Sequence, residues 1–370
     1  MSRLDELIAE LCSSGVEYKS IGEIANVSRG KVMSKDFLKE NIGEYPVYSS
    51  QTENNGQLGS INTFMFDGKY LTWTTDGANA GTVFYREGKF SVTNVCGVID
   101  VKDQDVDIRY LYFVLNREAP NHVNRGMGNP KLMSNVMCKI KVPVPPLEVQ
   151  CEIVRILDNF TELTAELTAE LTARKQQYEY YREMLLTDTT DAPLKRLGDT
   201  CNMKSGKAIK AVMLSSEKDE EHDYPCFGGN GIRGYIAEPS HHGEYPIIGR
   251  QGALCGNVNY ATGDFYATEH AVVVKSKGEY DQRYLFYLLT SMNLNQYKSQ
   301  GAQPGLAVGN IENLMAPVPS LEKQKRIVNV LDRFDMLCED ISSGLPAEIE
   351  ARQKHYEYYR DKLLTFKQLA

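Results

Sequence analysis

The side chains of this sequence that could do chemistry are hydrogen-bond donors placed beside glycines. Lysine, arginine, asparagine and glutamine recur in "SRGKVMSK", "TTDGANAG" and "NRGMGNPK" in the first half and in "MKSGKAIK", "NGIRG", "GRQGA" and "KSQGAQPG" in the second. Cations and amides of this kind clamp phosphate oxygens and read the edges of bases. A solvated surface charge explains any single lysine equally well, but the loops occupy corresponding positions in both halves, which favours a function. The candidate donors are Arg29, Lys31, Lys35, Thr75, Asn79, Arg125, Asn129, Lys131, Lys204, Lys207, Lys210, Arg233, Arg250, Gln251, Lys298 and Gln303.

Catalytic signatures are missing from the sequence. It contains no N-P-P-[YF] or D-P-P-[YF] motif of adenine methyltransferases, no G-x-x-x-x-G-K-[ST] phosphate loop and no H-E-x-x-H. The run "GGNGIRG" has the G-x-G-x-x-G spacing, but the turn formers of "YIAEPSHHGEYP" follow it where a dinucleotide site needs a helix, so we predict a turn. His241 and His242 have no nearby ligand set and are predicted in a surface loop. We predict no catalytic residue, no metal and no cofactor bound by this chain.

Composition limits the class of protein. The eight cysteines form no C-x-x-C pair, which favours reduced thiols over disulfides or zinc. No apolar run approaches the roughly 20 residues of a membrane span, and "MSRLDELIAE" lacks the apolar stretch of a signal peptide. We therefore expect a cytoplasmic protein with no membrane contact.

The net charge of -8 argues against a nucleic-acid partner unless the charge is unevenly placed. It is uneven, because much of the acid lies in "EKDEEHD" at residues 217–223 and along one predicted helix. The helix carries Glu148, Glu152, Asp158, Glu162, Glu166, Glu170, Glu179 and Glu183. Basic faces on the glycine-rich domains remain compatible with the total.

The chain repeats itself with a period of about 175 residues, and such repeats define the architecture. "GKYLTWTTDGANAGTVFYREGKFSVT" from Gly68 matches "GEYPIIGRQGALCGNVNYATGDFYAT" from Gly243 at a constant offset of 175. "RYLYFVL", "VPVPPLEVQ" and "YEYYR" recur as "RYLFYLL", "APVPSLEKQ" and "YEYYR". Each half is therefore a globular segment followed by a helical segment.

The globular segments, residues 15–145 and 190–319, are predicted to be mostly β. Short β-branched or aromatic runs such as "KYLTW" and "HAVVVK" are separated by the turn signals "DG", "NG", "EG" and "TG". One helix is predicted in each, at "DIRYLYFVLN" and "DQRYLFYLLT", where apolar residues recur at spacings of three and four.

The helical segments, residues 146–189 and 320–370, carry apolar stripes typical of a coiled-coil seam. The first should run unbroken from Leu147 to Leu186, roughly 60 Å at 1.5 Å per residue; the second should break at Gly344-Leu345-Pro346. The seam is predicted to contain Leu163, Leu167, Leu171, Leu337, Ile341, Leu345 and Ile349.

The order of these segments predicts an α+β chain with a pseudo-twofold repeat, in which the two long helices pair antiparallel. The first helix leads away from the first domain and the last one leads back. Residues 1–14 form a helical stub that takes the place of the end of the central helix, since Lys19, Ile21 and Gly22 match Lys195, Leu197 and Gly198. The two chain ends should therefore meet.

With these segments the chain resembles the specificity (S) subunit of type I restriction-modification enzymes over its whole length. The resemblance is carried by "PVPPLEVQCEIVRILDNF", the "TAEL" tract, "QYEYYREMLL", "PVPSLEKQKRIVNVLDRF" and "GLPAEIEARQKHYEYYRDKLLTF". It implies two target-recognition domains that each read half of a bipartite double-stranded DNA site, with the donors above as DNA-binding residues. It also implies a complex with two methyltransferase (M) subunits and motor-nuclease (R) subunits, on which S-adenosylmethionine, ATP and Mg are expected.

The "TAEL" tract then measures the gap between the half-sites. Four added residues lengthen a helix by about 6 Å and turn its end by about 40° beyond a full turn. One base-pair step advances about 3.4 Å and turns about 35°, so we expect one base pair per repeat, with two left open. The plain alternative is that "TAEL" is only a good helix former with leucine at every fourth place.

Tyrosine and arginine in "QYEYYREMLL" and "HYEYYRDKLL" have the composition of interface hot spots. We predict Tyr180, Arg182, Tyr358 and Arg360 as partner-binding residues; helix–helix packing is their alternative role. Two other functions for the chain stay open: a coiled-coil scaffold with two β domains that bind protein or carbohydrate, and an unrecognised enzyme that uses the glycine-rich loops.

Overall fold

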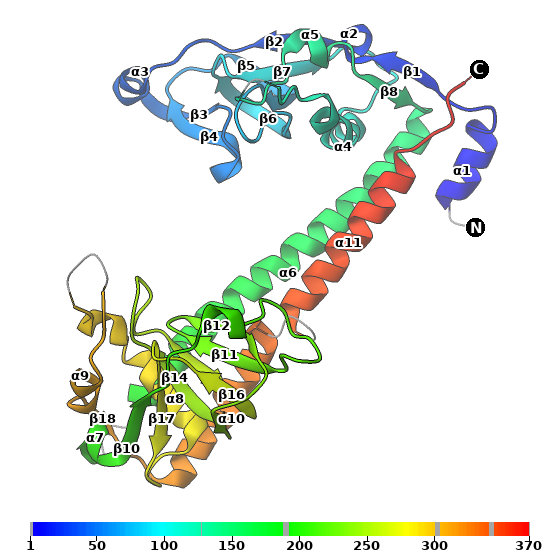
Figure 1. Cartoon of the computed structure of the whole chain (residues 1–370). Coiled ribbons are helices and arrows are strands. Elements are labelled where there is room, and N and C mark those ends of the chain that lie inside the picture. Colours follow the sequence, from blue (N-terminus) through cyan, green and yellow to red (C-terminus); the bar gives the residue numbers. More distant parts are fainter. Residues whose placement is uncertain (1–2, 127, 188–191, 300–303, 340–343, 370) are drawn as a thin grey trace. The chain divides into compact units, whose positions relative to one another are not determined.

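The computed structural model describes residues 3–126, 128–187, 192–299, 304–339 and 344–369 (Figure 1). The chain divides into two compact units, Met1–Leu167 with Ile349–Ala370, and Thr168–Glu348. Each unit holds one β domain and part of the long helix α6 (Leu147–Thr187), so the predicted α+β class is confirmed. Within the described ranges, no helix is long and apolar enough to cross a membrane.

The β domain of the first unit is built on one six-stranded sheet. Its strand order is β2 (Ala25–Arg29), β7 (Cys96–Val101), β5 (Phe66–Thr74), β6 (Val83–Val92), β3 (Ile42–Tyr48) and β4 (Gln57–Ile61). A two-stranded sheet pairs β1 (Glu17–Ser20) with β8 (Lys141–Val144). The short helices are α1 (Arg3–Leu11), α2 (Ile21–Ile24), α3 (Lys35–Glu40), η1 (Glu53–Gly56), η2 (Ala119–His122) and α5 (Ser134–Met137).

The predicted helix of this domain is α4 (Ile108–Glu118). It begins where the carboxylate of Asp107 accepts a hydrogen bond from the Tyr110 amide, at 2.8 Å, as an N-cap. Its buried face, which includes Tyr110, Leu111 and Val114, packs into the main core together with Trp73 of β5. Apolar spacing of three and four thus predicted this element correctly.

The second unit has two four-stranded sheets in place of the one six-stranded sheet. One has the order β10 (Cys201–Ser205), β17 (Ala271–Ser276), β14 (Tyr245–Gly249), β15 (Val258–Ala261); the other has β12 (Gly231–Ile236), β11 (Tyr224–Gly228), β16 (Asp264–Ala267), β13 (His241–His242). The pair β9 (Leu194–Arg196) and β18 (Met315–Pro317) matches β1 and β8. The helices are α7 (Leu197–Thr200), η3 (Ala211–Met213), α8 (Gln282–Ser291), η4 (Leu294–Tyr297), α9 (Val308–Glu312) and α10 (Leu321–Glu339).

Two predictions about this unit have clear outcomes. The "GGNGIRG" run is the turn of the β11–β12 hairpin and has no helix after it, as predicted. His241 and His242 do not lie in a loop: they form β13, which pairs antiparallel with β16, and the His241 ring stacks on Phe265 with centroids 5.2 Å apart. Stacking on an aromatic ring is a tertiary contact that residue type alone did not indicate.

The long helices pair antiparallel. Helix α6 is continuous as predicted, and α11 (Leu345–Leu363) begins at the predicted break. Phe160 of α6 stacks on Tyr359 of α11 in the first unit, and Tyr181 stacks on Phe334 of α10 in the second. Partner numbers fall as those on α6 rise, which is the order of an antiparallel pair (Figure 1).

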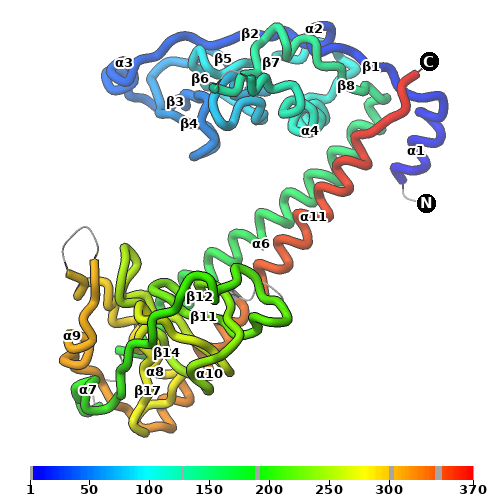
Figure 2. Tube along the Cα trace, in the orientation of Figure 1, coloured from blue at the N-terminus to red at the C-terminus, as the bar shows by residue number. Residues whose placement is uncertain are grey.

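The two ends of the chain meet in the first unit, as predicted. The Val16 amide donates to the Lys367 carbonyl at 2.8 Å, and the Leu369 amide donates to the Val16 carbonyl at 2.9 Å. Figure 2 shows the C-terminal segment passing between β1 and α1. The Tyr18 hydroxyl adds a hydrogen bond to the Phe366 carbonyl at 3.0 Å.

A buried glutamine ties each β domain to the helix that follows it. Gln150 accepts from the Asp107 amide at 2.8 Å and donates to the Asp105 and Pro145 carbonyls, each at 2.7 Å. Gln324 does the same with the Asp281 amide and the Glu279 and Pro319 carbonyls, at 2.7, 2.9 and 2.8 Å. We call these contacts the glutamine junctions; because both side chains are fully buried, each hydrogen bond replaces one lost to water.

An arginine on α4 and another on α8 make a second tie, which we call the arginine clamps. Arg109 binds Asp158 of α6, with 2.9 Å between Nε and the carboxylate, and its guanidinium lies over three aromatic rings. Arg283 binds both Asp332, at 2.7 Å, and Asp335, at 2.9 Å, and also lies over three rings. Cation–π stacking and charged hydrogen bonds together hold each domain helix on its long helix.

Candidate nucleic-acid interface

Two candidate loops of the first domain are joined by backbone hydrogen bonds. The Leu132 amide donates to the Thr75 carbonyl at 2.8 Å, and the Gly77 amide donates to the Pro130 carbonyl at 3.0 Å. Asp76 and Lys131 form a β-bridge between the loops. Side chains of Asn79, Arg125, Asn129 and Lys131 on this pair of loops are exposed. The structure therefore brings these four candidates into one connected surface.

Thr75 is a correction to the predicted donor set. Its side chain is 1% exposed, and its hydroxyl donates to the Val95 carbonyl at 2.9 Å. It cannot reach a ligand, because it is buried directly after the last residue of β5, Thr74. Its role is to hold the loop, so the donor prediction for Thr75 is wrong.

The "SRGK" segment approaches β6 so closely that only glycine fits. A Cβ on Gly30 would lie 1.8 Å from the Val92 carbonyl oxygen, and one on Gly206 of the matching "KSGK" would lie 1.9 Å from that of Ala267. Lys31 and Lys207 follow these glycines and are exposed. Arg29 is half-buried and donates to the Ser134 hydroxyl at 3.1 Å. It therefore makes a contact within the domain in addition to its predicted contact with DNA. Lys35 is exposed and begins α3.

The second domain repeats the joint between the loops. The Leu306 amide donates to the Arg250 carbonyl at 2.8 Å, the Gly252 amide donates to the Pro304 carbonyl at 3.0 Å, and Gln251 and Gly305 form the bridge. Arg250 is half-buried and donates from Nη1 to the Ser205 hydroxyl at 2.9 Å, so it links two candidate segments. Gln251, Arg233 and Lys298 are exposed. Gln303 lies outside the described residues.

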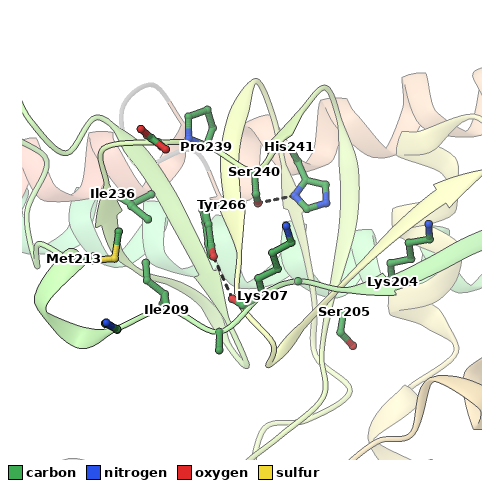
Figure 3. Close-up of a pocket in the computed structure, with 14 residues that line it drawn as sticks. Lys204, Ser205, Lys207, Ile209, Met213, Ile236, Pro239, Ser240, His241 and Tyr266 are labelled. Carbon is green, nitrogen blue, oxygen red and sulfur yellow. Dashed lines mark hydrogen bonds between the residues drawn. The ribbon is translucent and has the colours of Figure 1, made fainter.

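Two cavities open on this part of the second domain. One of about 480 Å³ is lined by Gly229, Gln251, Gly252, His270, Pro304 and Gly305. The other, of about 760 Å³, is lined by residues that include Lys204, Lys207 and Lys210 together with Ser240, His241 and Tyr266 (Figure 3). Burial lowers the pKa of His241, so the imidazole is neutral at pH 7. Three lysines against the single acid Glu238 give this cavity a positive lining suited to phosphate.

The predicted partner-binding residues divide into two kinds. Tyr180 and Tyr358 are 64% and 63% exposed, which is unusual for large aromatic side chains. Arg182 and Arg360 are half-buried and lie over the rings of Tyr178 and Tyr356, 5.3 and 5.8 Å from the centroids. The tyrosines are therefore free to meet a partner, whereas the arginines also pack on their own helices.

Most of the side chains predicted in the seam between the long helices are only partly buried. Leu345 is 8% exposed, and Leu167, Leu171, Leu337 and Ile349 are half-buried. Leu163 is 42% exposed, so little of it is covered by the helix pair. Two paired helices lack a third layer that would cover the contact, which leaves such side chains partly in water. Ile341 lies outside the described residues.

Sequence reasoning missed two sets of residues. The glutamine junctions and arginine clamps lie inside the quoted repeats "LEVQ" and "RYLYFVL", but a repeat alone does not say which of its members form contacts. It also missed Arg86 and the loop at residues 49–56, where the first domain has residues that the second lacks. The interrupted match between the two halves was the available signal.

Comparison with known proteins agrees with this architecture. Residues 13–174 and 191–351 each match the family described as Type I restriction modification DNA specificity domain. A putative type I specificity subunit from Mycoplasma pneumoniae is 33% identical over 93% of this chain and 96% of its own length. The EcoprrI specificity subunit of Escherichia coli is 54% identical, but the match spans only 54% of this chain and 52% of that protein.

Solved structures share the fold. The S subunit from M. genitalium superposes with a TM-score of 0.66 at 16% identity, covering 95% of this chain and 96% of that one. A chain from a study of complex assembly in the type I R-M system gives 0.57 at 15% identity, with 95% and 97% covered. The chain belongs to the family of type I restriction-modification DNA specificity subunits, which are the non-catalytic part of these complexes.

Proposed function

We propose that residues 15–145 and 190–319 are target-recognition domains and that each reads one half of a bipartite site in double-stranded DNA. The observation that carries the proposal is that two loops with candidate donor side chains are joined in each domain. Equivalent backbone hydrogen bonds join them in both domains. Exposed lysine, arginine and amide groups on such loops can contact phosphates and base edges. The two domains share this backbone arrangement but carry different side chains on it, as expected if each domain reads a different DNA sequence.

The cationic cavity of the second domain supports phosphate contact there. Lys204 is in β10 and Lys207 follows it; the Lys207 amide donates to the Ala267 carbonyl of β16 at 3.1 Å, and the Tyr266 hydroxyl donates to the Lys207 carbonyl at 3.3 Å (Figure 3). These hydrogen bonds fix the backbone that carries the lysines. Two of the acidic side chains of α6 in the first unit are paired: Glu152 binds Arg155, and Asp158 binds Arg109.

The remaining segments are the spacer and the docking surface. Residues 146–189 and 320–370 form the paired helices that set the gap between half-sites, and residues 1–14 complete the repeat at the chain's start. Exposed Tyr180 and Tyr358 sit at matching places on them and dock two methyltransferase subunits, to which motor-nuclease subunits add. S-adenosylmethionine, ATP and Mg belong to those partners, and the complex works on DNA in the cytoplasm.

Exchange of one domain tests the proposal. Residues 15–145 are replaced by the equivalent domain of a related specificity subunit, and the chimera is expressed with its methyltransferase partner. Sequencing of methylated motifs should find one half-site changed, with the other half-site and the gap preserved. A simultaneous change of both halves contradicts two independent readers. The matched exchange of residues 190–319 is the control, and it should change the other half-site alone.

A further inference from the structure

The first domain has a loop between β3 and β4 that the second domain lacks. "YPVYSSQTENNG", residues 45–56, has twelve residues, whereas the matching "YPCFGGNG", residues 224–231, has eight. The extra residues fall in the connection that we call the 49–56 loop. Its counterpart is the tight β11–β12 turn.

The backbone of the 49–56 loop is strained at its tip. Asn54, Asn55 and Gly56 have φ values of 48°, 53° and 78°, so three successive residues are left-handed. Asparagine tolerates this conformation better than other side chains but still less well than glycine. Strained residues persist only where their surroundings hold them, and they concentrate at functional sites. The side chains of Asn54 and Asn55 are exposed, and no protein group in the described residues pairs with either amide.

A buried arginine holds this conformation. Arg86 of β6 is 3% exposed, and its Nη2 donates to the Asn55 carbonyl at 2.8 Å. Its Nε donates to the Thr72 hydroxyl at 3.1 Å, and its guanidinium carbon lies 3.6 Å from the centroid of the Tyr48 ring. Among the described residues no acidic side chain pairs with it, and Nη1 is buried without a partner. Burial accordingly lowers the pKa of Arg86.

A buried guanidinium without a carboxylate costs stability that an apolar residue would not. The second domain has Ala261 at the equivalent position, at the offset of 175, and there the loop is absent too. The cation and the loop therefore occur together. Since the Asn55 carbonyl is the loop group that Arg86 binds, fixing the loop is the function that accounts for the charge.

The 49–56 loop also adjoins the candidate interface. The Asn79 amide donates to the Thr52 hydroxyl at 3.0 Å, which connects this loop to the exposed loop at residues 75–81. The Ser49 hydroxyl accepts from Thr93 at 3.0 Å, and Thr93 is bridged to Lys31. Two candidate segments thus connect to the loop, one directly through Asn79 and one through Thr93, with the two unpaired asparagine amides at its tip.

The geometry points to the 49–56 loop as a base-reading element of the first domain, with Arg86 as its positioning residue. An asparagine amide matches the paired donor and acceptor on the major-groove edge of adenine, so Asn54 and Asn55 should read adenine in the first half-site. This inference rests on the proposed function, since it assigns one reading element within a domain that must first read DNA.

The test replaces both asparagines by glycine (Asn54→Gly with Asn55→Gly) in the full chain co-expressed with its methyltransferase subunits. Glycine keeps the left-handed backbone and removes only the amides. The expected result is loss of discrimination at one or two adenine positions of the first half-site, by about 5- to 150-fold per contact, with the second half-site and the gap unchanged. Asn293→Gly is the matched control, because Asn293 is also left-handed and exposed, at φ 46°, but lies in the second domain. It should leave the motif as it is.

Arg86→Met tests the positioning role by removing the charge and keeping a long side chain. It should relax the same adenine positions while Asn54 and Asn55 are intact, which a loss of stability alone would not do. An unchanged first half-site in the double glycine variant overturns the inference, whether or not Arg86→Met folds. Exchange of residues 15–145 separates the two ideas: if it switches the half-site while the glycine variant does not, only the loop assignment fails.

Discussion

In both β domains a glutamine from the following helix contacts one amide and two carbonyls, at distances that agree within about 0.2 Å between the copies. The loops of the two domains agree far less. One has the strained 49–56 loop over a buried arginine; the other has a tight turn and a lysine-lined cavity. Groups that attach a domain to its helix are kept in both copies, whereas groups that would meet DNA differ. This division suits the proposed function, in which both domains attach to the helices in the same way but read different half-sites.

The clamps lie between these extremes. Arg109 and Arg283 share the stacked aromatic rings and the first carboxylate. The second copy adds Asp335 and the Tyr287 hydroxyl, where the first has Thr161 and Phe113. Both domains therefore have an arginine clamp, but the clamp of the second domain makes more contacts.

The largest expected effect comes from changing the rotation of one β domain relative to the other about the axis of α6. Deletion of Thr164 and Ala165 turns the rest of α6 by about 200° and brings charged side chains toward the seam. Methylation of every target should be lost. Deletion of Thr164–Leu167 is the control, since it keeps the leucine spacing, shortens the helix by about 6 Å and turns it by about 40° beyond one full turn.

The four-residue deletion should therefore methylate the same two half-sites with a gap shorter by about one base pair. Motif sequencing of both variants gives the answer. An unaltered gap in the four-residue deletion would mean that the "TAEL" tract is only a helix and not a spacer.

The next largest effect concerns the docking surface. Tyr180→Ala and Tyr358→Ala should each weaken capture of the methyltransferase subunit, by roughly 30-fold if each tyrosine is a hot spot worth about 2 kcal/mol. Because both side chains are mostly exposed, thermal unfolding of the free subunit should stay unchanged. Titration of labelled methyltransferase measures the affinity. Tyr260→Ala, which removes a ring beneath Arg283, is the contrasting variant and should lower stability instead of partner affinity.

The clamps should differ by a measurable amount. Arg283→Ala removes two carboxylate contacts and the stacking on three rings, and we expect a loss of about 2 kcal/mol in unfolding free energy. Arg109→Ala also removes stacking on three rings but only one carboxylate contact, and it should cost about 1 kcal/mol, since both clamps are partly in water and screened. Arg326→Ala breaks an exposed pair with Glu322 and is the control near zero. Equal losses at Arg109 and Arg283 would show that Asp335 contributes nothing.

The fold could be predicted from the sequence largely because the chain is duplicated. Because "RYLYFVL" and "VPVPPLEVQ" each occur in a similar form in both halves, an element predicted in one half supported the same element in the other. Helices α4, α8 and α6 and the meeting of the chain ends were predicted correctly. The site was predicted less well, for physical reasons that residue type does not carry. Thr75 and Thr82 look alike as loop threonines, yet only Thr75 is buried.

Arg86 is a second residue whose role could not be predicted from residue type, because it is a charged side chain that is buried. It stands in "VFYREGKF" as an ordinary charged residue of a hairpin, and only the fold reveals that it is buried against Tyr48 and binds the Asn55 carbonyl. Contacts between segments about thirty residues apart depend on strand pairing and on the path of each loop. Local patterns therefore predicted elements, whereas the pairing of loops had to come from the structure.

The smallest expected effect is a difference of nearly zero between the glutamine junctions. Gln150→Ala and Gln324→Ala each leave two carbonyls and one amide without their partner in a buried place, so each should cost about 1–3 kcal/mol of unfolding free energy. Because the three contacts are alike in kind and length, the two losses should agree within about 0.5 kcal/mol, the range expected for equivalent, independent sites. Each loss should be read by hydrogen exchange within its own unit, at the amides of Leu111 and Leu285, which donate to the Asp107 and Asp281 carbonyls and keep their acceptors in both variants. A clear inequality would mean that the frame itself differs between the copies, and the contrast between a shared frame and divergent loops would then be too simple.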